Sequence, residues 1–145
     1  MLDFSGREAV VTGGTGALGS AVVGRLITAG ATVHVPVYIA EELERFAYRD
    51  HDAVRVHKGL DLGKEADVAR LYAATSVLYA SVHIAGGFAM GPVGDTSLET
   101  WEHLMRMNAT TCFLCSREAV RTLGAGEGRI VNVAARPALV PTAQM

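Results

Sequence analysis

The sequence predicts an α/β domain built on a doubly wound parallel sheet, and three observations lead to it. Short apolar runs alternate along the chain with segments whose apolar residues recur at helical spacing. The runs contain few polar residues, as expected for parallel strands covered on both faces. A turn rich in glycine, Thr12–Gly19 (TGGTGALG), follows the first run. A chain of 145 residues, 50% of them hydrophobic, suits one domain over residues 1–145.

Each element is expected from its local pattern. Apolar runs predict strands at 7–12, 31–37, 53–57, 78–85 and 129–133. Helical spacing predicts helices at 17–29, 40–48, 64–74 and 97–123. Gly30 supplies a stop for the first helix, and Ser97 is a candidate N-terminal cap for the last. Right-handed crossovers from a central first strand predict the strand order 3-2-1-4-5.

Composition and charge argue against several classes of function. A net charge of -2 offers no electrostatic basis for binding nucleic acid or an acidic membrane surface. Residues 71–94 contain no Asp, Glu, Lys or Arg, but glycines and Pro92 interrupt the second half, so a membrane span is not expected. Residues 1–5 lack the cationic start and apolar core of a signal peptide. We therefore expect a cytoplasmic protein.

The two cysteines, Cys112 and Cys115, form a C-x-x-C motif. A redox or metal role is one interpretation, but the sequence has no second cysteine pair to complete a zinc site. The two residues between the cysteines, Phe113 and Leu114, are apolar, which favours an interpretation of the cysteines as small buried thiols in the middle of a helix. No metal site is expected.

The glycine-rich turn is the most informative stretch. Gly14–Gly19 reads G-x-G-x-x-G directly after the first predicted strand and at the start of the first predicted helix. In that setting glycines permit a tight turn, and the free N–H groups of the helix start can hold a pyrophosphate. A flexible surface loop would explain the six residues alone, but its place in the strand–helix pattern favours nucleotide binding.

The chain resembles the short-chain dehydrogenase/reductase family over its whole length. Residues 12–19 match the family's T-G-x-x-x-G-x-G, with Ala17 in place of the middle glycine. Residues 83–87 (HIAGG) match the N-N-A-G segment with both asparagines lost, and residues 128–133 match the run into the fifth strand. The resemblance implies a Rossmann-like fold, a nicotinamide cofactor, and hydride transfer to or from a small carbonyl or alcohol substrate. It also implies a homo-oligomer formed through the helix at 97–123.

The resemblance assigns roles to individual residues. Asp61 matches the acid that contacts the adenine ring, although it could instead cap the helix expected from Lys64. Asn108 matches the asparagine that holds a proton-relay water. It could be a solvated polar residue, but its apolar neighbours predict a largely buried face, where an asparagine needs hydrogen-bond partners. The implied cofactor-binding residues are Gly13, Thr15, Gly16, Leu18, Gly19, Val37, Tyr38, Asp61, Leu62, Ala85, Gly86 and Gly87.

The choice between NAD and NADP stays open in the sequence. An NAD enzyme usually carries an acid at the end of the second strand to bind the ribose hydroxyls. Val37 occupies that place here and Tyr38 follows it. Gly16 stands where some NADP enzymes of the family carry a basic residue. Glu41 and Glu42 are interpreted as acids of a helix's first turn rather than as ribose ligands.

The catalytic residues of the family are largely missing from these 145 residues. Ala135 occupies the position of the serine that orients the substrate carbonyl, and the spacing does not bring the Thr142 hydroxyl there. None of the four tyrosines has a lysine four residues later, as the Tyr-x-x-x-Lys pair requires. We therefore expect a coenzyme-binding part truncated before that pair. The alternative is a non-catalytic dinucleotide-binding protein, either regulatory or a pseudoenzyme.

Overall fold

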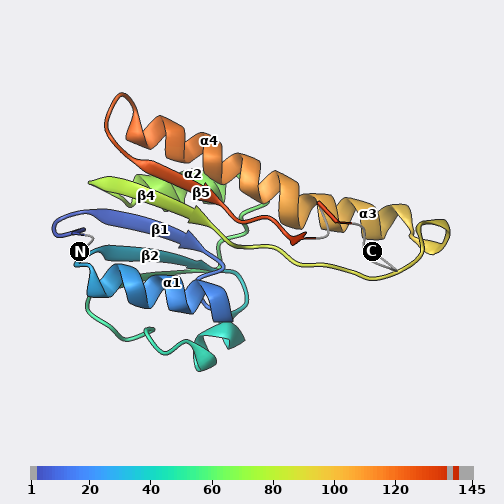
Figure 1. The fold of residues 1–145 in the computed structure, drawn as a ribbon, viewed down its shortest axis with the longest axis horizontal. Coiled ribbons are helices and arrows are strands. Elements are labelled where there is room, and N and C mark those ends of the chain that lie inside the picture. Colours follow the sequence, from blue (N-terminus) through green and yellow to red (C-terminus); the bar gives the residue numbers. More distant parts are fainter. Residues whose placement is uncertain (1–2, 137–138, 141–145) are drawn as a thin grey trace.

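A computed structural model describes residues 3–136 and 139–140. Within these residues, apolar runs form a parallel sheet with the strand order β3-β2-β1-β4-β5, as predicted (Figure 1). The strands are β1 Glu8–Thr12, β2 Thr32–Val37, β3 Val54–Lys58, β4 Leu78–His83 and β5 Arg129–Asn132. Their registers bring the carboxyl ends of β1, β4 and β5 together, because Thr12 pairs with His83 and His83 with Asn132. The loops that follow these strands therefore meet at one edge of the sheet.

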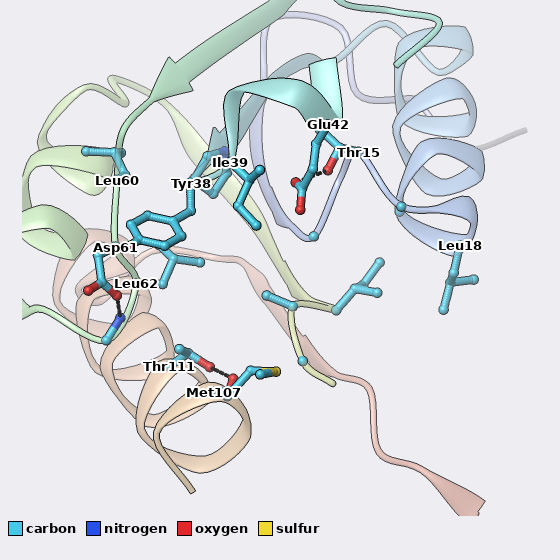
Figure 2. Close-up of a pocket in the computed structure, with 18 of the residues that line it drawn as sticks. Thr15, Leu18, Tyr38, Ile39, Glu42, Leu60, Asp61, Leu62, Met107 and Thr111 are labelled. Atoms are coloured by element: carbon cyan, nitrogen blue, oxygen red, sulfur yellow. Dashed lines mark hydrogen bonds between the residues drawn. The ribbon is translucent and has the colours of Figure 1, made fainter. Parts of the chain in front are cut away.

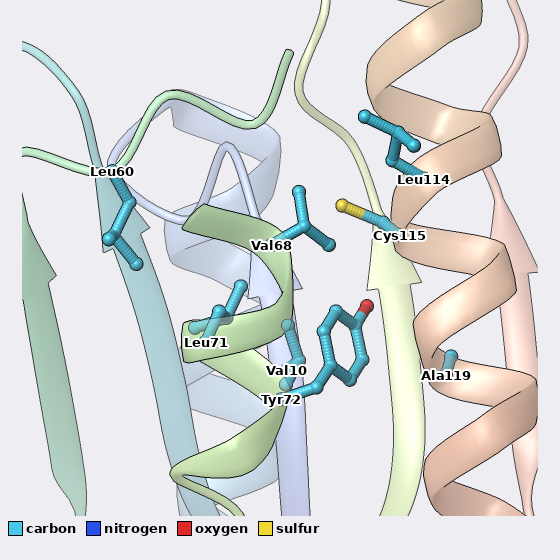
Figure 3. Close-up of a cluster of buried hydrophobic side chains, with 8 residues drawn as sticks. All are labelled: Val10, Leu60, Val68, Leu71, Tyr72, Leu114, Cys115 and Ala119. Atoms are coloured by element: carbon cyan, nitrogen blue, oxygen red, sulfur yellow. The ribbon is translucent and has the colours of Figure 1, made fainter. Parts of the chain in front are cut away.

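Helices cover both faces of the sheet, and the neighbouring strands β1 and β2 are buried along almost their whole length. The α-helices are α1 Ala17–Thr28, α2 Glu65–Ala73, α3 Leu98–Met105 and α4 Thr111–Leu123. On one face α1 packs over β1 and β2, and Val23 and Phe46 lie in the cluster beneath it. On the other face α2 packs against α4, and Leu71, Tyr72 and Cys115 fill the space between these helices and Val10 of β1 (Figure 3).

The segment expected as an amphipathic α-helix at 40–48 is instead the short 3₁₀ helix η1, Ala40–Arg45. It ends because Phe46 leaves the helix in an extended conformation and buries its ring in the cluster under α1. Burial of a large aromatic ring outweighs the weak helical preference of six mostly exposed residues. The predicted position was correct, but the helix type and its end were wrong.

The long helix expected at 97–123 is continuous in direction but not uniform. Ser97 caps its start by accepting a hydrogen bond from the backbone nitrogen of Thr100, as the sequence predicts. Between α3 and α4 lies one π-helical segment, η3, Arg106–Thr110. In Figure 1 α3 projects beyond the sheet, and every residue of α3 is at least partly exposed.

The cysteines lie inside the long helix, as predicted, with Cys112 near the start of α4 and Cys115 one turn later. Cys115 is buried, whereas Cys112 is only partly buried. Burial in an apolar cluster raises the pKa of the Cys115 thiol to about 12, so this thiol stays protonated and unreactive at neutral pH. The uncharged stretch 71–94 ends α2, forms β4 and continues as the following loop. Among the described residues, the structure holds no helix with both the length and the apolar character needed to cross a bilayer.

Candidate functional site

A cavity of about 1220 Å³ opens at the carboxyl edge of the sheet, between the loops after β1, β2, β3 and β4 and the segment η3 (Figure 2). Most of the residues that the sequence assigns to a cofactor line this one cavity. They are Gly13, Thr15, Gly16, Leu18, Gly19, Tyr38, Asp61, Leu62, Ala85 and Gly86. In doubly wound sheets ligands bind at the carboxyl ends of the strands, beside the point where the strand order reverses. Here that point lies between β1 and β4.

The glycine turn is held in place by the end of β4. The hydroxyl of buried Thr12 accepts hydrogen bonds from the backbone nitrogens of Ile84 and Ala85, each at 3.1 Å. Gly13 has a φ of 65°, and a Cβ there would lie 2.8 Å from the backbone nitrogen of Ala85. A Cβ at Gly19 would collide with the carbonyl of Gly13. Both positions therefore require glycine, and the turn stays closely packed.

This turn leads directly into α1, whose first residues are Ala17, Leu18, Gly19 and Ser20. All four are uncharged, and the first N–H groups of a helix have no partner within it. Ser20 is the exception here, since its N–H donates to the carbonyl of Gly16. The helix dipole adds a partial positive charge at the same place. The start of α1 therefore offers a site for a phosphate group, and the methyl group of Ala17, an exposed residue, replaces a glycine without blocking the turn.

The end of β2 differs from what the sequence predicted. Val37 does not line the cavity, since its side chain is buried in the cluster beneath α1. Alternation along the strand turns the next side chain the other way, and Tyr38 is 67% exposed and faces the cavity. Figure 2 shows Tyr38 extending toward the region of Asp61 and Leu62.

A carboxylate nevertheless reaches the glycine turn from η1. The Thr15 hydroxyl donates a hydrogen bond of 2.8 Å to Oε2 of Glu42, and both residues line the cavity (Figure 2). The interpretation of Glu42 as only a first-turn helix acid is therefore incomplete. It lies in the first turn of η1, but its side chain is directed to the cavity.

Asp61 lies at the opening of the cavity after β3 and does not cap α2. The N-terminal cap position is Lys64, and the Asp61 carboxylate instead accepts hydrogen bonds from the backbone nitrogen of Gly63 and from Arg106 of η3. The Arg106 Nη2–Asp61 Oδ2 distance is 2.7 Å. Asp61 therefore keeps its carboxylate toward the cavity rather than toward the helix.

Asn108 joins η3 to the loop after β4. Its side-chain amide donates to the carbonyl oxygens of Gly87 and Leu104, and its Oδ1 accepts from the backbone nitrogen of Gly87 at 3.1 Å. A Cβ at Gly86 would lie 2.5 Å from this Oδ1, so the loop approaches closely only because Gly86 has none. Gly87 contacts Asn108 but does not line the cavity.

The predicted burial of the face around Asn108 is wrong. Asn108 and Phe113 are exposed, since η3 and the start of α4 extend past the edge of the sheet. The amide finds its partners in the backbone of the neighbouring loop and in its own helix, not in a buried core. Sequence spacing indicated apolar neighbours, but it carries no information on how far the helix projects.

A polar cluster that the sequence pattern did not predict lies beside this loop. His83 Nδ1 is 2.7 Å from Oδ1 of Asn132, and its Nε2 is 2.8 Å from the Ser81 hydroxyl, which also contacts the Tyr72 hydroxyl. Since Oδ1 only accepts, His83 donates from Nδ1 and accepts at Nε2. Desolvation lowers the pKa of His83, and the hydrogen bond to Asn132 opposes this.

Neither Tyr72 nor the position of Ala135 supplies a catalytic group. Burial raises the pKa of the Tyr72 phenol far above its usual range, so it cannot release its proton near neutral pH. Ala135 follows β5 and is exposed. Thr142 and the residues from 141 onward lie outside the described residues.

Three functional candidates, Glu42, Arg106 and the His83 cluster, were missed or set aside by sequence reasoning. A histidine in place of the family's asparagine at position 83 was the available signal for the cluster. Nothing local marks Arg106, because its partner Asp61 is 45 residues away.

Comparison with known proteins agrees with this geometry. A family profile described as short chain dehydrogenase matches residues 7–145. A 2,3-dihydroxy-2,3-dihydro-p-cumate dehydrogenase of Pseudomonas putida is 34% identical over 143 residues, covering 92% of this chain and 55% of that protein. The D-threitol dehydrogenase of Mycolicibacterium smegmatis is 31% identical, with 94% and 55% covered. The chain thus spans about half the length of these two relatives.

Solved structures show the same fold. A short-chain dehydrogenase/reductase variant of Serratia marcescens superposes with a TM-score of 0.84 at 27% identity, over 97% of this chain and 60% of that one. An actinorhodin polyketide ketoreductase crystallised with NADPH gives 0.86 at 24% identity, over 95% and 56%. With its matching profile, sheet order and glycine turn, the chain belongs to the short-chain dehydrogenase family.

Proposed function

We propose that this chain is the coenzyme-binding part of an oxidoreductase that transfers hydride between NAD(P)H and a carbonyl or alcohol. The observation that carries the proposal is one cavity lined by the glycine turn, the residues after β3 and the loop after β4. The residues fit a dinucleotide, because glycine at positions 13 and 19 lets the turn pack closely and the start of α1 presents N–H groups to an anion.

Each part of the cavity has a role in this proposal. The start of α1 binds the pyrophosphate, Asp61 and Leu62 hold the adenine end, and Ala85 and Gly86 lie along the nicotinamide end. When bound, the nicotinamide ring supplies or accepts the hydride. Asn108 fixes the loop after β4 through its pair of hydrogen bonds to Gly87 and holds a proton-relay water during turnover.

We further propose that NAD is preferred over NADP. Val37 stands where an NAD enzyme usually carries an acid at the end of β2. The Glu42 carboxylate instead reaches the glycine turn, where it accepts a hydrogen bond from the Thr15 hydroxyl. A carboxylate accepts hydrogen bonds from ribose hydroxyls and repels a 2′-phosphate. Glu41 lines the same part of the cavity. Among the described residues from η1 that line it, two carboxylates therefore stand against one guanidinium, that of Arg45.

Titration with NADH and NADPH, followed by cofactor fluorescence, tests both parts. The wild-type chain is expected to bind NADH more tightly than NADPH. Glu42→Gln is expected to reduce this difference in affinity, because it weakens the binding of NADH and strengthens the binding of NADPH. Glu44→Gln is the matched control, because Glu44 lies on the same 3₁₀ helix but does not line the cavity. Failure to bind either cofactor would contradict the proposed function. An unchanged preference in Glu42→Gln would contradict only the NAD assignment.

The substrate class proposed is a small carbonyl or alcohol, with Ala135 at the position of the carbonyl-orienting serine. A methyl group donates no hydrogen bond, so the substrate carbonyl is expected to bind more weakly than it would beside a serine hydroxyl. Turnover in this proposal also requires a tyrosine–lysine pair, and these 145 residues contain no tyrosine with a lysine four residues later.

We also propose a homo-oligomer formed through the long helix. Leu98, Trp101 and Met105 are exposed along α3 at spacings of three and four residues, and Phe113 and Val120 continue along α4. Exposed apolar side chains at this density favour a protein partner. Sedimentation of the wild type and of Trp101→Glu tests this, with a shift of the variant toward monomer as the expected result.

A further inference from the structure

The Asp61 carboxylate is held from two sides. Its Oδ1 accepts from the backbone nitrogen of Gly63 at 2.9 Å, which Figure 2 draws as a dashed line, and its Oδ2 accepts from Nη2 of Arg106 at 2.7 Å. Lys64 contributes less, since its ammonium lies 3.8 Å from Oδ2. The side chain of Asp61 is 19% exposed, so these contacts leave it little freedom to change rotamer.

Arg106 reaches this carboxylate from the first position of the π-helical segment η3. Its side chain also lies directly over Gly63, where a Cβ would be 2.6 Å from Nε and 3.2 Å from Cγ. The absence of a side chain at Gly63 therefore makes room for the guanidinium.

The contact is poorly placed to stabilise the fold. The Arg106 side chain is 53% exposed, and ion pairs at such positions contribute little to stability. It is well placed to orient a ligand, because Arg106, Asp61 and Gly63 all line the cavity. An ionised carboxylate only accepts hydrogen bonds, and each of its oxygens has a second lone pair beyond those used by Gly63 and Arg106.

We infer that Arg106 is a positioning residue that fixes the Asp61 carboxylate as an acceptor and thereby sets the preference for the base of the cofactor. Adenine carries a 6-amino group, which donates to a carboxylate, whereas hypoxanthine carries a 6-oxo group, which is repelled by it. The inference rests on the proposed dinucleotide function. It adds a residue on the long helix whose action on the cofactor passes through Asp61.

The test is a titration of NADH and of reduced nicotinamide hypoxanthine dinucleotide, followed by fluorescence. The measured ratio is the dissociation constant of the hypoxanthine dinucleotide divided by that of NADH, so a larger ratio means a stronger preference for adenine. The wild type is expected to prefer NADH, and Arg106→Gln is expected to reduce the ratio by about two- to fivefold, the effect of losing an ion pair at this exposure. Arg121→Gln is the matched control, because Arg121 pairs with Glu118 on α4 and does not line the cavity.

Two further variants separate positioning from a general structural effect. Arg106→Lys keeps the charge without the planar guanidinium, so its ratio is expected between those of the wild type and the Gln variant. In an Asp61→Asn background the amide can also donate, and adding Arg106→Gln is expected to change the ratio no further. If Arg106→Gln does not fold, the Lys variant and this double variant carry the test.

The outcomes are distinguishable. A wild type that binds neither dinucleotide contradicts the proposed function itself. A wild type that binds both, with an Arg106 variant that keeps the wild-type ratio or weakens both dinucleotides equally, overturns the positioning role alone. A reduced ratio in Arg106→Gln but not in Arg121→Gln supports it.

Discussion

The Thr12 hydroxyl lies 3.1 Å from the backbone nitrogen of Ala85 and accepts its hydrogen bond. The same oxygen accepts from Ile84, so one buried side chain joins the glycine turn after β1 to the loop after β4. Residues of both loops line the cavity. Their relative position therefore depends on a side chain that precedes the glycines.

Replacing Thr12 with valine is expected to destabilise the fold. Valine keeps the shape but leaves the Ala85 N–H without this acceptor, at a cost of about 1–3 kcal/mol in the free energy of unfolding, whereas the Ile84 N–H keeps the backbone carbonyl of Thr12. Urea unfolding measures this change. Thr28→Val on the exposed end of α1 is the control, with an expected change within about 0.5 kcal/mol. Equal effects in the two variants would contradict the role assigned to Thr12.

Gly19→Val is expected to abolish or greatly weaken cofactor binding. The new side chain would press on the backbone of Gly13 and Gly14, and such overpacking costs typically about 1–3 kcal/mol. Fluorescence titration measures binding, and circular dichroism checks that the variant is folded. Gly94→Ala is the control, since a Cβ there meets nothing within 4 Å. A folded Gly19→Val chain with wild-type affinity would remove the glycine turn from the site.

Stability is expected to fall as the pH drops below about 6.5, the pKa of an unperturbed histidine. Desolvation lowers the pKa values of His34, His57 and His83 in the folded chain. The unfolded chain therefore binds protons more readily in this range, so the stabilisation is complete above pH 6.5 and is lost on acidification.

His34 offers the sharpest test of this pH dependence. It faces His57 at 2.9 Å, Glu8 at 3.6 Å and the charge of Arg55. Urea unfolding at pH 8 and pH 5.5 measures the loss, and His34→Gln is expected to make the loss smaller. An identical loss in wild type and variant would show that His34 does not contribute.

The 145 residues by themselves are expected to bind cofactor without turnover. They contain no tyrosine with a lysine four residues on, and a positioned acid/base group contributes typically ~10²–10⁴-fold. Absorbance of NAD(P)H with a panel of carbonyls measures turnover. Robust turnover would contradict the prediction. A longer product of the same coding sequence is expected to turn over if it includes Tyr-x-x-x-Lys, and its failure to do so would favour a non-catalytic binding protein.

Local pattern was sufficient for the order of the elements and for the glycine turn. Apolar periodicity identified the five strands of the described sheet and placed most ends within two residues. Ser97 and Gly30 mark helix ends because caps and stops depend on neighbouring residues only. Residues 14–19 predicted an anion-binding turn for the same reason, since the turn and the helix start are adjacent in the chain.

The contacts that shape the cavity were decided by the tertiary structure. Thr15 meets Glu42 across 27 residues, and Asp61 meets Arg106 across 45. Asn108 is exposed because its helix projects past the sheet, and Val37 turns inward because the phase of β2 buries it under α1. Such contacts depend on how whole elements pack and on which side of a strand a residue lies. A pattern confined to a few neighbouring residues contains neither piece of information, so the sequence alone determined which elements form and only their packing decided which side chains meet.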